Sequence, residues 1–151
     1  MTLSSTEYPD AQDSELLRLI KASDWLSVKS LLRTNEGTTM TKIPDVYGNL
    51  PLHASIGYKA PDEIVLAILS HNPEATKRHG SDYWLPLHVA AMWGSSAKVL
   101  EEIIKAYPQA LDDQGEPGIK GRTPRHFAAR FKHLKNLLER PTVEWIKIIE
   151  N

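Results

Sequence analysis

The sequence predicts an all-α domain built from repeated pairs of helices. A four-residue motif with proline at its second position occurs three times, and the prolines stand 35 and then 38 residues apart. The three copies are Leu50-Pro51-Leu52-His53, Leu85-Pro86-Leu87-His88 and Thr123-Pro124-Arg125-His126. A segment rich in Leu, Ile and Val follows each of the first two copies and ends before another proline. A period of this length is typical of helical repeat proteins, in which each unit is one helix pair.

This repeat resembles the ankyrin repeat, in which a turn precedes a first helix beginning Thr-Pro-Leu-His-x-Ala-Ala, and glycine precedes the second helix. The match is best from Leu85 to Gly94, which reads Leu-Pro-Leu-His-Val-Ala-Ala-Met-Trp-Gly. The preceding copy departs from the pattern, with Ser55-Ile56 in place of the alanines and Lys59 in place of Gly94. The resemblance covers residues 14–150. It implies an all-α ankyrin-repeat solenoid of about four helix-turn-helix units with projecting loops.

Prolines predict where most of the helices begin and end. Pro51 and Pro86 mark the first turn of a helix, because proline at the first helical position loses no hydrogen bond that the helix needs. Pro61 precedes two carboxylates, which favour the positive N-terminal end of a second helix. We expect Pro73 and Pro108 to end the second helices, because proline cannot continue them.

The chain divides by these signals into a tail and one domain. We expect a disordered N-terminal tail, residues 1–13, followed by an ankyrin-repeat domain, residues 14–151. The domain comprises a degenerate first repeat (14–46), a second (47–81), a third (82–119) and an irregular C-terminal capping repeat (120–151). In the last unit Arg125 replaces the buried leucine. The apolar residues there predict one long first helix, and Pro141 predicts the start of a short helix. Those apolar residues are Phe127, Phe131, Leu134 and Leu138.

Composition excludes several classes of protein. The 151 residues are 41% apolar and 25% charged, with 18 Lys and Arg against 19 Asp and Glu, which excludes a collagen-like rod and a globally basic nucleic-acid binder. The absence of cysteine excludes a disulfide framework and a zinc–thiolate site. The first residues lack the basic and apolar segments of a signal peptide, and the longest apolar run is too short to span a membrane. We expect a cytoplasmic or nuclear protein that is a monomer in isolation.

The sequence predicts neither an enzyme nor a cofactor or metal site. It has no phosphate-binding loop, nucleophile elbow, His-Glu-x-x-His motif or dinucleotide fingerprint. His53, His88 and His126 recur in register, but stacked helices lie about 8–10 Å apart, too far for equivalent residues to share an ion bound at about 2.0–2.1 Å. We expect each imidazole to bind backbone groups and tie one unit to the next, which is also the role that the ankyrin resemblance implies.

Aromatic residues outside the repeat motif indicate a binding surface. Tyr58, Trp93 and Phe131 stand five positions after the three motif histidines. The resemblance implies that this slot faces a concave groove, although an aromatic side chain at helical spacing also fits packing in the core. Aromatic residues and arginine dominate binding hot spots. The candidate partner-binding residues are Tyr58, Tyr83, Trp84, Trp93, Arg122 and Arg130.

Charge is unevenly distributed along the chain. Residues 120–140 contain seven basic residues and one acidic residue, which gives this segment a net charge of +6. This indicates a partner with an acidic surface. The basic residues surround a helix instead of lining one face, which disfavours nucleic acid. The resulting hypothesis is a protein–protein interaction module, an adaptor or scaffold. The alternatives are a regulatory inhibitor or subunit of an enzyme, and a binder of phosphate-rich ligands through Lys120–Arg140.

Overall fold

The structure is a computed structural model that describes residues 13–116 and 121–151. Within these ranges all regular secondary structure is helical, which confirms the predicted all-α class. The predicted tail, residues 1–13, lies outside the described residues apart from Asp13. None of the helices in the described ranges has the length and apolar character needed to cross a membrane.

The two described ranges contain nine α-helices and five 3₁₀ helices. The α-helices are α1 (Glu15–Lys21), α2 (Trp25–Leu32), α3 (Asn35–Met40), α4 (Pro51–Gly57), α5 (Asp62–His71), α6 (Pro86–Trp93), α7 (Ala97–Ala106), α8 (Lys135–Glu139) and α9 (Thr142–Glu150). The 3₁₀ helices are η3 (Pro73–Lys77), η4 (Ser81–Tyr83), η5 (Pro108–Asp112), η6 (Pro124–Phe127) and η7 (Lys132–Leu134). The helix starts predicted at Pro51 and Pro86 are confirmed, as are the helix ends before Pro73 and Pro108.

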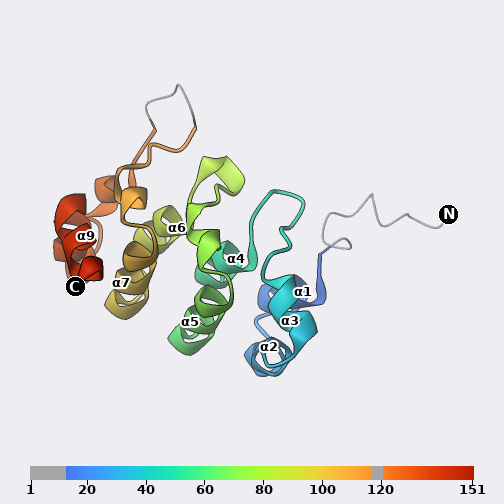
Figure 1. Ribbon diagram of the computed structural model, residues 1–151. Helices are drawn as coiled ribbons and strands as arrows, with labels where there is room; N and C mark the ends of the chain where they lie inside the picture. The colour runs from blue at the N-terminus through green and yellow to red at the C-terminus, as the bar shows by residue number, and fades with distance from the viewer. Residues whose placement is uncertain (1–12, 117–120) are drawn as a thin grey trace.

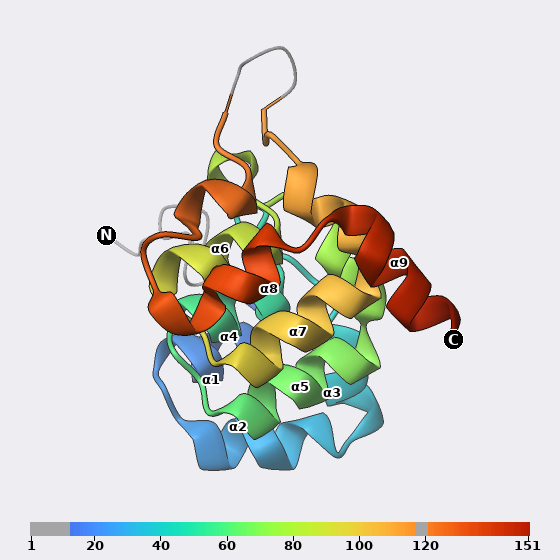
Figure 2. The same ribbon diagram turned by 90° about the vertical axis from the view of Figure 1, so that its left-hand side faces the viewer.

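The helix pairs stack in chain order, so that the molecule has two layers of helices (Figure 1). The first helices form one layer, in which α4 packs against both α1 and α6. The second helices form the other layer, in which α5 packs against both α2 and α7. Figure 2 shows this stack after a turn of 90°, with α1, α4 and α6 on one side of α2, α5 and α7. The turns that precede α4 and α6 project from the same edge of the stack (Figure 1).

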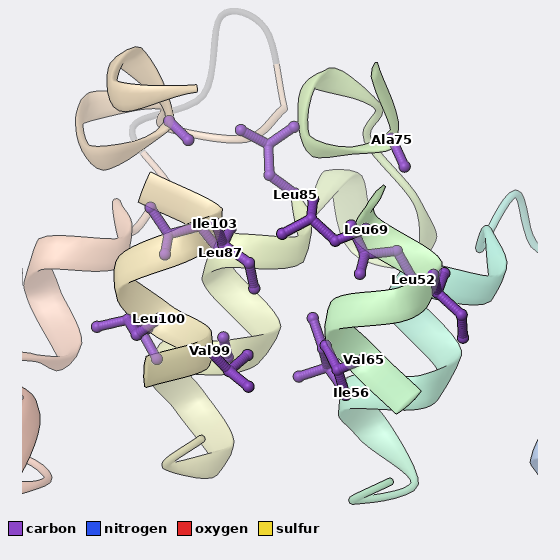
Figure 3. Close-up of a cluster of buried hydrophobic side chains, with 14 of the residues drawn as sticks. Leu52, Ile56, Val65, Leu69, Ala75, Leu85, Leu87, Val99, Leu100 and Ile103 are labelled. Carbon is purple, nitrogen blue, oxygen red and sulfur yellow. The ribbon is translucent and has the colours of Figure 1, made fainter. Parts of the chain in front are cut away.

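The core lies between the two layers. Figure 3 shows buried side chains from α4, α5, α6 and α7 gathered there, including Leu52 and Leu87 of the repeated motif. Both leucines are fully buried, as are Ile68 and Ile103 of the second helices. Burying one such side chain contributes roughly 1.5–3 kcal/mol. A unit therefore depends on its neighbours for much of its stability, because they cover the other face of its helices.

A left-handed residue ends the first helix of three successive units. Ser23, Lys59 and Gly94 have φ angles of 55°, 57° and 73°. Each stands eight residues after the first residue of its helix. Glycine adopts this conformation without strain, whereas lysine and serine do not. Gly94 is also needed for space, because a Cβ atom there would lie 2.7 Å from the Phe131 ring.

The prediction of one long first helix in the C-terminal unit is wrong. The chain instead forms η6, η7 and α8, and Phe131 has extended backbone angles of φ −130° and ψ 115°. The break brings Arg125 close to the end of α8, where its Nη1 donates to the carbonyls of Leu138 (2.6 Å) and Arg140 (2.7 Å). A straight helix would separate Arg125 from Leu138 by about 20 Å. The predicted short helix after Pro141 is confirmed as α9.

Candidate functional site

A groove with a volume of about 480 Å³ lies along α4 and α6 and the turns that precede them. Its lining brings together Tyr58 and Trp93 from the helix ends, and Tyr47 and Trp84 from the turns. Val89 of α6, which is partly buried, contributes apolar surface to the same lining. The groove therefore joins two successive units, and three of the candidate binding residues line it.

Tyr58 and Trp93 are the exposed aromatic residues at the helix ends of the groove. Their exposed fractions are 47% and 50%. Tyr58 caps the C-terminus of α4, and Trp93 is the last residue of α6. The left-handed residue that follows each of them, Lys59 or Gly94, turns the chain back toward the second helix. Each ring thus stands at the point where its helix stops, with no further helical turn to cover it.

Trp84 has a different environment, because it is partly buried. Its ring stacks on His88 with ring centroids 5.9 Å apart and an interplanar angle of 17°. It also forms an edge-on contact with the Phe127 ring, with ring centroids 5.8 Å apart. These contacts fix the orientation of the indole, so Trp84 forms a rigid part of the groove lining and also joins the third unit to the last.

His53 links the second unit to the third. Its Nδ1 accepts a hydrogen bond from the Leu50 N–H at 3.2 Å, at the start of its own helix. Its Nε2 lies 3.0 Å from the Trp84 carbonyl, so this nitrogen carries the proton and donates. Burial lowers the pKa of His53 to about 4, although the bond to Trp84 acts in the opposite direction. The imidazole is therefore neutral at pH 7.

His88 repeats this arrangement one unit later. Its Nδ1 accepts from the Leu85 N–H at 3.0 Å. Its Nε2 lies 2.9 Å from the Arg122 carbonyl and 3.0 Å from the Asp113 carbonyl, and therefore donates toward both sides of the following loop. Burial lowers the pKa of His88 as well. Because Trp84 stacks on this ring, the hydrogen bonds of His88 also position one side of the groove.

His126 lies at the same position of the motif but is exposed. Its Nδ1 accepts from the Thr123 N–H at 2.6 Å and lies 3.1 Å from the Thr123 hydroxyl. Both contacts lie within its own turn. His126 therefore stabilises the start of η6, and the expected tie to a following unit is not formed among the described residues.

The remaining candidates lie outside this groove. Tyr83 is 48% exposed and lines a neighbouring hollow of about 530 Å³. The exposed side chains of Arg122 and Arg130 line neither hollow. Arg130 lies over Phe131, with its guanidinium carbon 5.6 Å from the ring centroid. Phe131, which shares the sequence slot of Tyr58 and Trp93, is partly buried and packs against the core.

Arg125 of the basic segment 120–140 forms hydrogen bonds within the protein. Arg125 Nε donates to Asp112 Oδ1 at 2.8 Å, and its Nη2 donates to the Thr142 hydroxyl at 2.9 Å. Burial alone would raise the pKa of Asp112, but its bonds to Arg125 and Thr142 lower it. Lys120, the first residue of the segment, lies outside the described residues.

Sequence reasoning missed the ionic cluster at the edge of the groove. Lys21 Nζ lies 2.9 Å from Asp13 and 3.2 Å from Asp45. Burial alone would lower the pKa of Lys21, but the two carboxylates outweigh it and raise the pKa. Asn49 Oδ1 nearby accepts from the Ser81 N–H at 2.8 Å, which joins two successive turns. No motif spacing could reveal these contacts, because no local pattern connects the residues that they join.

The described residues contain no group of three or more His, Asp or Glu side chains that could hold a metal ion.

A scan against protein-family models and a search of curated proteins find no match for this sequence. The candidate site thus consists of an aromatic groove with two buried, neutral histidines in its scaffold.

Proposed function

We propose that the protein is a non-enzymatic binding module that holds a partner protein or peptide in the groove lined by Tyr58, Trp84 and Trp93. The observation that carries the proposal is the exposure of Tyr58 and Trp93 at equivalent positions of successive units, on one groove. Aromatic side chains that remain half-exposed in a hollow gain contact area when a partner covers them, at a small cost in conformational entropy.

The same proposal assigns the fold to the ankyrin-repeat solenoids. Three features support it: the period of the proline motif, the two-layered stack of helix pairs, and the bonds from His53 and His88 to the next unit. The proposed units are residues 14–46, 47–81, 82–119 and 120–151. The protein would act in the cytoplasm or nucleus as a monomeric adaptor. The exposed basic side chains after the third unit, Arg122, Arg130, Lys132 and Lys135, suit an acidic region of the partner.

Rigidity favours this function. Trp84 is held by His88 and Phe127, and the two turns beside the groove are joined through Asn49 and Ser81. A surface that is already ordered loses little entropy when a partner binds, so more of the contact energy contributes to affinity.

The test is affinity capture from a cell lysate with the wild-type protein and the variant Tyr58→Ala/Trp93→Ala. Both replaced side chains are half-exposed, so circular dichroism should show an intact fold. We expect each truncation to weaken partner binding by about 2 kcal/mol, which is about 30-fold.

A matched control is Leu26→Ala, which removes an exposed apolar side chain of α2 that does not line the groove. A partner retained by wild type and control but lost from the double variant supports the groove. The same partners bound equally by all three proteins would exclude it.

A further inference from the structure

The groove continues into the hollow beside Tyr83. Tyr47, Ser81 and Asp82 line both cavities, so one surface extends from Trp93 at the end of α6 to Glu116 after η5. The turns before α4 and α6, which project from one edge of the stack (Figure 1), contribute Tyr47, Ser81 and Asp82 to this surface. An extended segment of a partner could therefore contact both cavities at once.

The side chains of this continuous surface include four exposed aromatic rings, beside the partly buried Trp84, and several carboxylates. Tyr47 and Tyr83 add two rings, 61% and 48% exposed, to those of Tyr58 and Trp93. Asp82 and Glu116 are exposed carboxylates of the second cavity, which no basic side chain of the described residues lines.

The first cavity holds one lysine, Lys21. Its ammonium lies between Asp13 and Asp45, so its positive charge is already balanced by two carboxylates. His53 lines the same cavity but is neutral at pH 7. The charge that remains for a ligand on this surface is therefore negative.

The backbone beside Tyr83 is strained. Asp82 and Tyr83 are consecutive residues with φ angles of 59° and 60°, and a bulky residue in this conformation is uncommon. The Gly80 N–H donates to the Trp84 carbonyl at 2.8 Å and closes this turn. Strain of this kind clusters at functional sites, where surrounding contacts impose it. This turn places Asp82 in the lining of both cavities and Tyr83 in the lining of the second.

We propose that the occupant of this surface is a basic peptide segment, whose arginine or lysine side chain lies against the aromatic rings and pairs with Asp82 and Glu116. The face of an aromatic ring attracts cations through its quadrupole, and a carboxylate strengthens hydrogen bonds from guanidinium or ammonium groups. An acidic segment would meet like charges at the same two residues. This inference rests on the proposed function, because it names the chemistry of the partner in the proposed groove.

The test uses three synthetic peptides of nine residues, each with three Gly-Ser-X triplets in which X is arginine, glutamine or glutamate. They are titrated into ¹⁵N-labelled protein while the indole N–H signals of the four tryptophans are followed by NMR. We expect the arginine peptide to shift the signals of Trp84 and Trp93, and to leave those of Trp25 and Trp145 in place. The other two peptides should shift none. Absence of a shift with the arginine peptide, or an equal shift with the glutamate peptide, overturns the proposal.

The variant Asp82→Asn/Glu116→Gln tests the carboxylates. Asparagine tolerates the left-handed conformation at position 82, so the turn is preserved. We expect the affinity for the arginine peptide to fall by about fivefold or more. The matched control Glu36→Gln/Glu150→Gln removes the same charge from exposed positions outside both cavities. An equal loss in both variants would assign the effect to net charge alone and overturn the site.

The two proposals fail in different ways. If lysate capture depends on Tyr58 and Trp93 but the arginine peptide does not bind, the binding module stands and the basic ligand is wrong. If capture is independent of these two residues and the arginine peptide does not bind, both proposals fall.

Discussion

His88 and His126 occupy the same position of the same four-residue motif, yet their environments have little in common. His88 is buried and joins its helix to two carbonyls of the following loop, whereas His126 is exposed and bonds only within its own turn. The preceding residue differs as well, since Leu87 is fully buried and Arg125 replaces it in the last unit. A repeated motif therefore specifies the start of a helix locally, while the packing of that helix depends on its neighbours.

Arg125 shows how the last unit compensates for the lost leucine. Instead of filling an apolar site, its guanidinium bonds to two carbonyls, one carboxylate and one hydroxyl. These bonds draw η6, α8 and the start of α9 together around one side chain. The last unit thus adds a polar cluster around Arg125 to the apolar burial that it shares with the regular units, which its fully buried Leu134, Leu138 and Trp145 provide.

The comparison predicts its largest difference in stability between variants of the two histidines. We expect His88→Ala to lower the free energy of unfolding by about 4 kcal/mol, because it leaves a buried N–H and carbonyls without partners and creates a cavity. His126→Ala should cost less than about 1 kcal/mol, since water can replace an exposed ring. Urea denaturation of the two variants measures both values. Equal losses would show that the motif histidines have one role in every unit.

The pH dependence of stability should reflect the buried histidines of the regular units. The pKa of His53 is about 4 in the folded protein and about 6.5 in the unfolded chain. Between these two pH values the unfolded chain binds more protons than the folded protein. The contribution of His53 to the free energy of unfolding is therefore fully present above pH 6.5 and is lost as the pH falls toward 4. His53 alone would account for about 3 kcal/mol of that loss.

The variant His53→Gln isolates this contribution. Over the interval from pH 6 to 5, the loss of stability in the wild-type protein should exceed that in the variant by about 1.2 kcal/mol. Urea denaturation at the two pH values checks this difference. An identical loss in both proteins would mean that His53 is not held neutral.

A smaller effect is expected from restoring the motif leucine in the last unit. Arg125→Leu should lower the free energy of unfolding by about 2 kcal/mol, because the carbonyls of Leu138 and Arg140 and the Asp112 carboxylate lose a charged donor. Arg130→Leu is the control, since Arg130 is exposed and should change stability by less than about 0.5 kcal/mol. Urea denaturation compares the two variants. If the Arg125→Leu protein is at least as stable as the wild type, the polar cluster does not hold this unit.

The sequence predicted the helical class and the helix starts at Pro51 and Pro86, because proline and its motif act locally. It also grouped Tyr58 with Trp93, because register within a repeat can be read without a structure. The break at Phe131 could not be predicted in this way, since the apolar spacing there also fits a continuous helix. The bonds of Arg125 that accompany the break join residues 13 to 17 positions apart. The ionic cluster of Lys21 was equally inaccessible, because no local pattern pairs it with Asp13 and Asp45.

The bonds from each histidine to the next unit also bear on how the chain assembles during synthesis. His53 reaches a carbonyl 31 residues later, and His88 reaches one 34 residues later. The bond from His53 Nε2 to Trp84 therefore forms only after the start of the third unit has left the ribosome, and the bond from His88 Nε2 to Arg122 only after the start of the last unit has done so. Closing so short a loop costs little entropy, and helix pairs with near neighbours as partners fold quickly. The order of synthesis thus matches the order of stacking, and each new unit completes the polar contacts of the one before it.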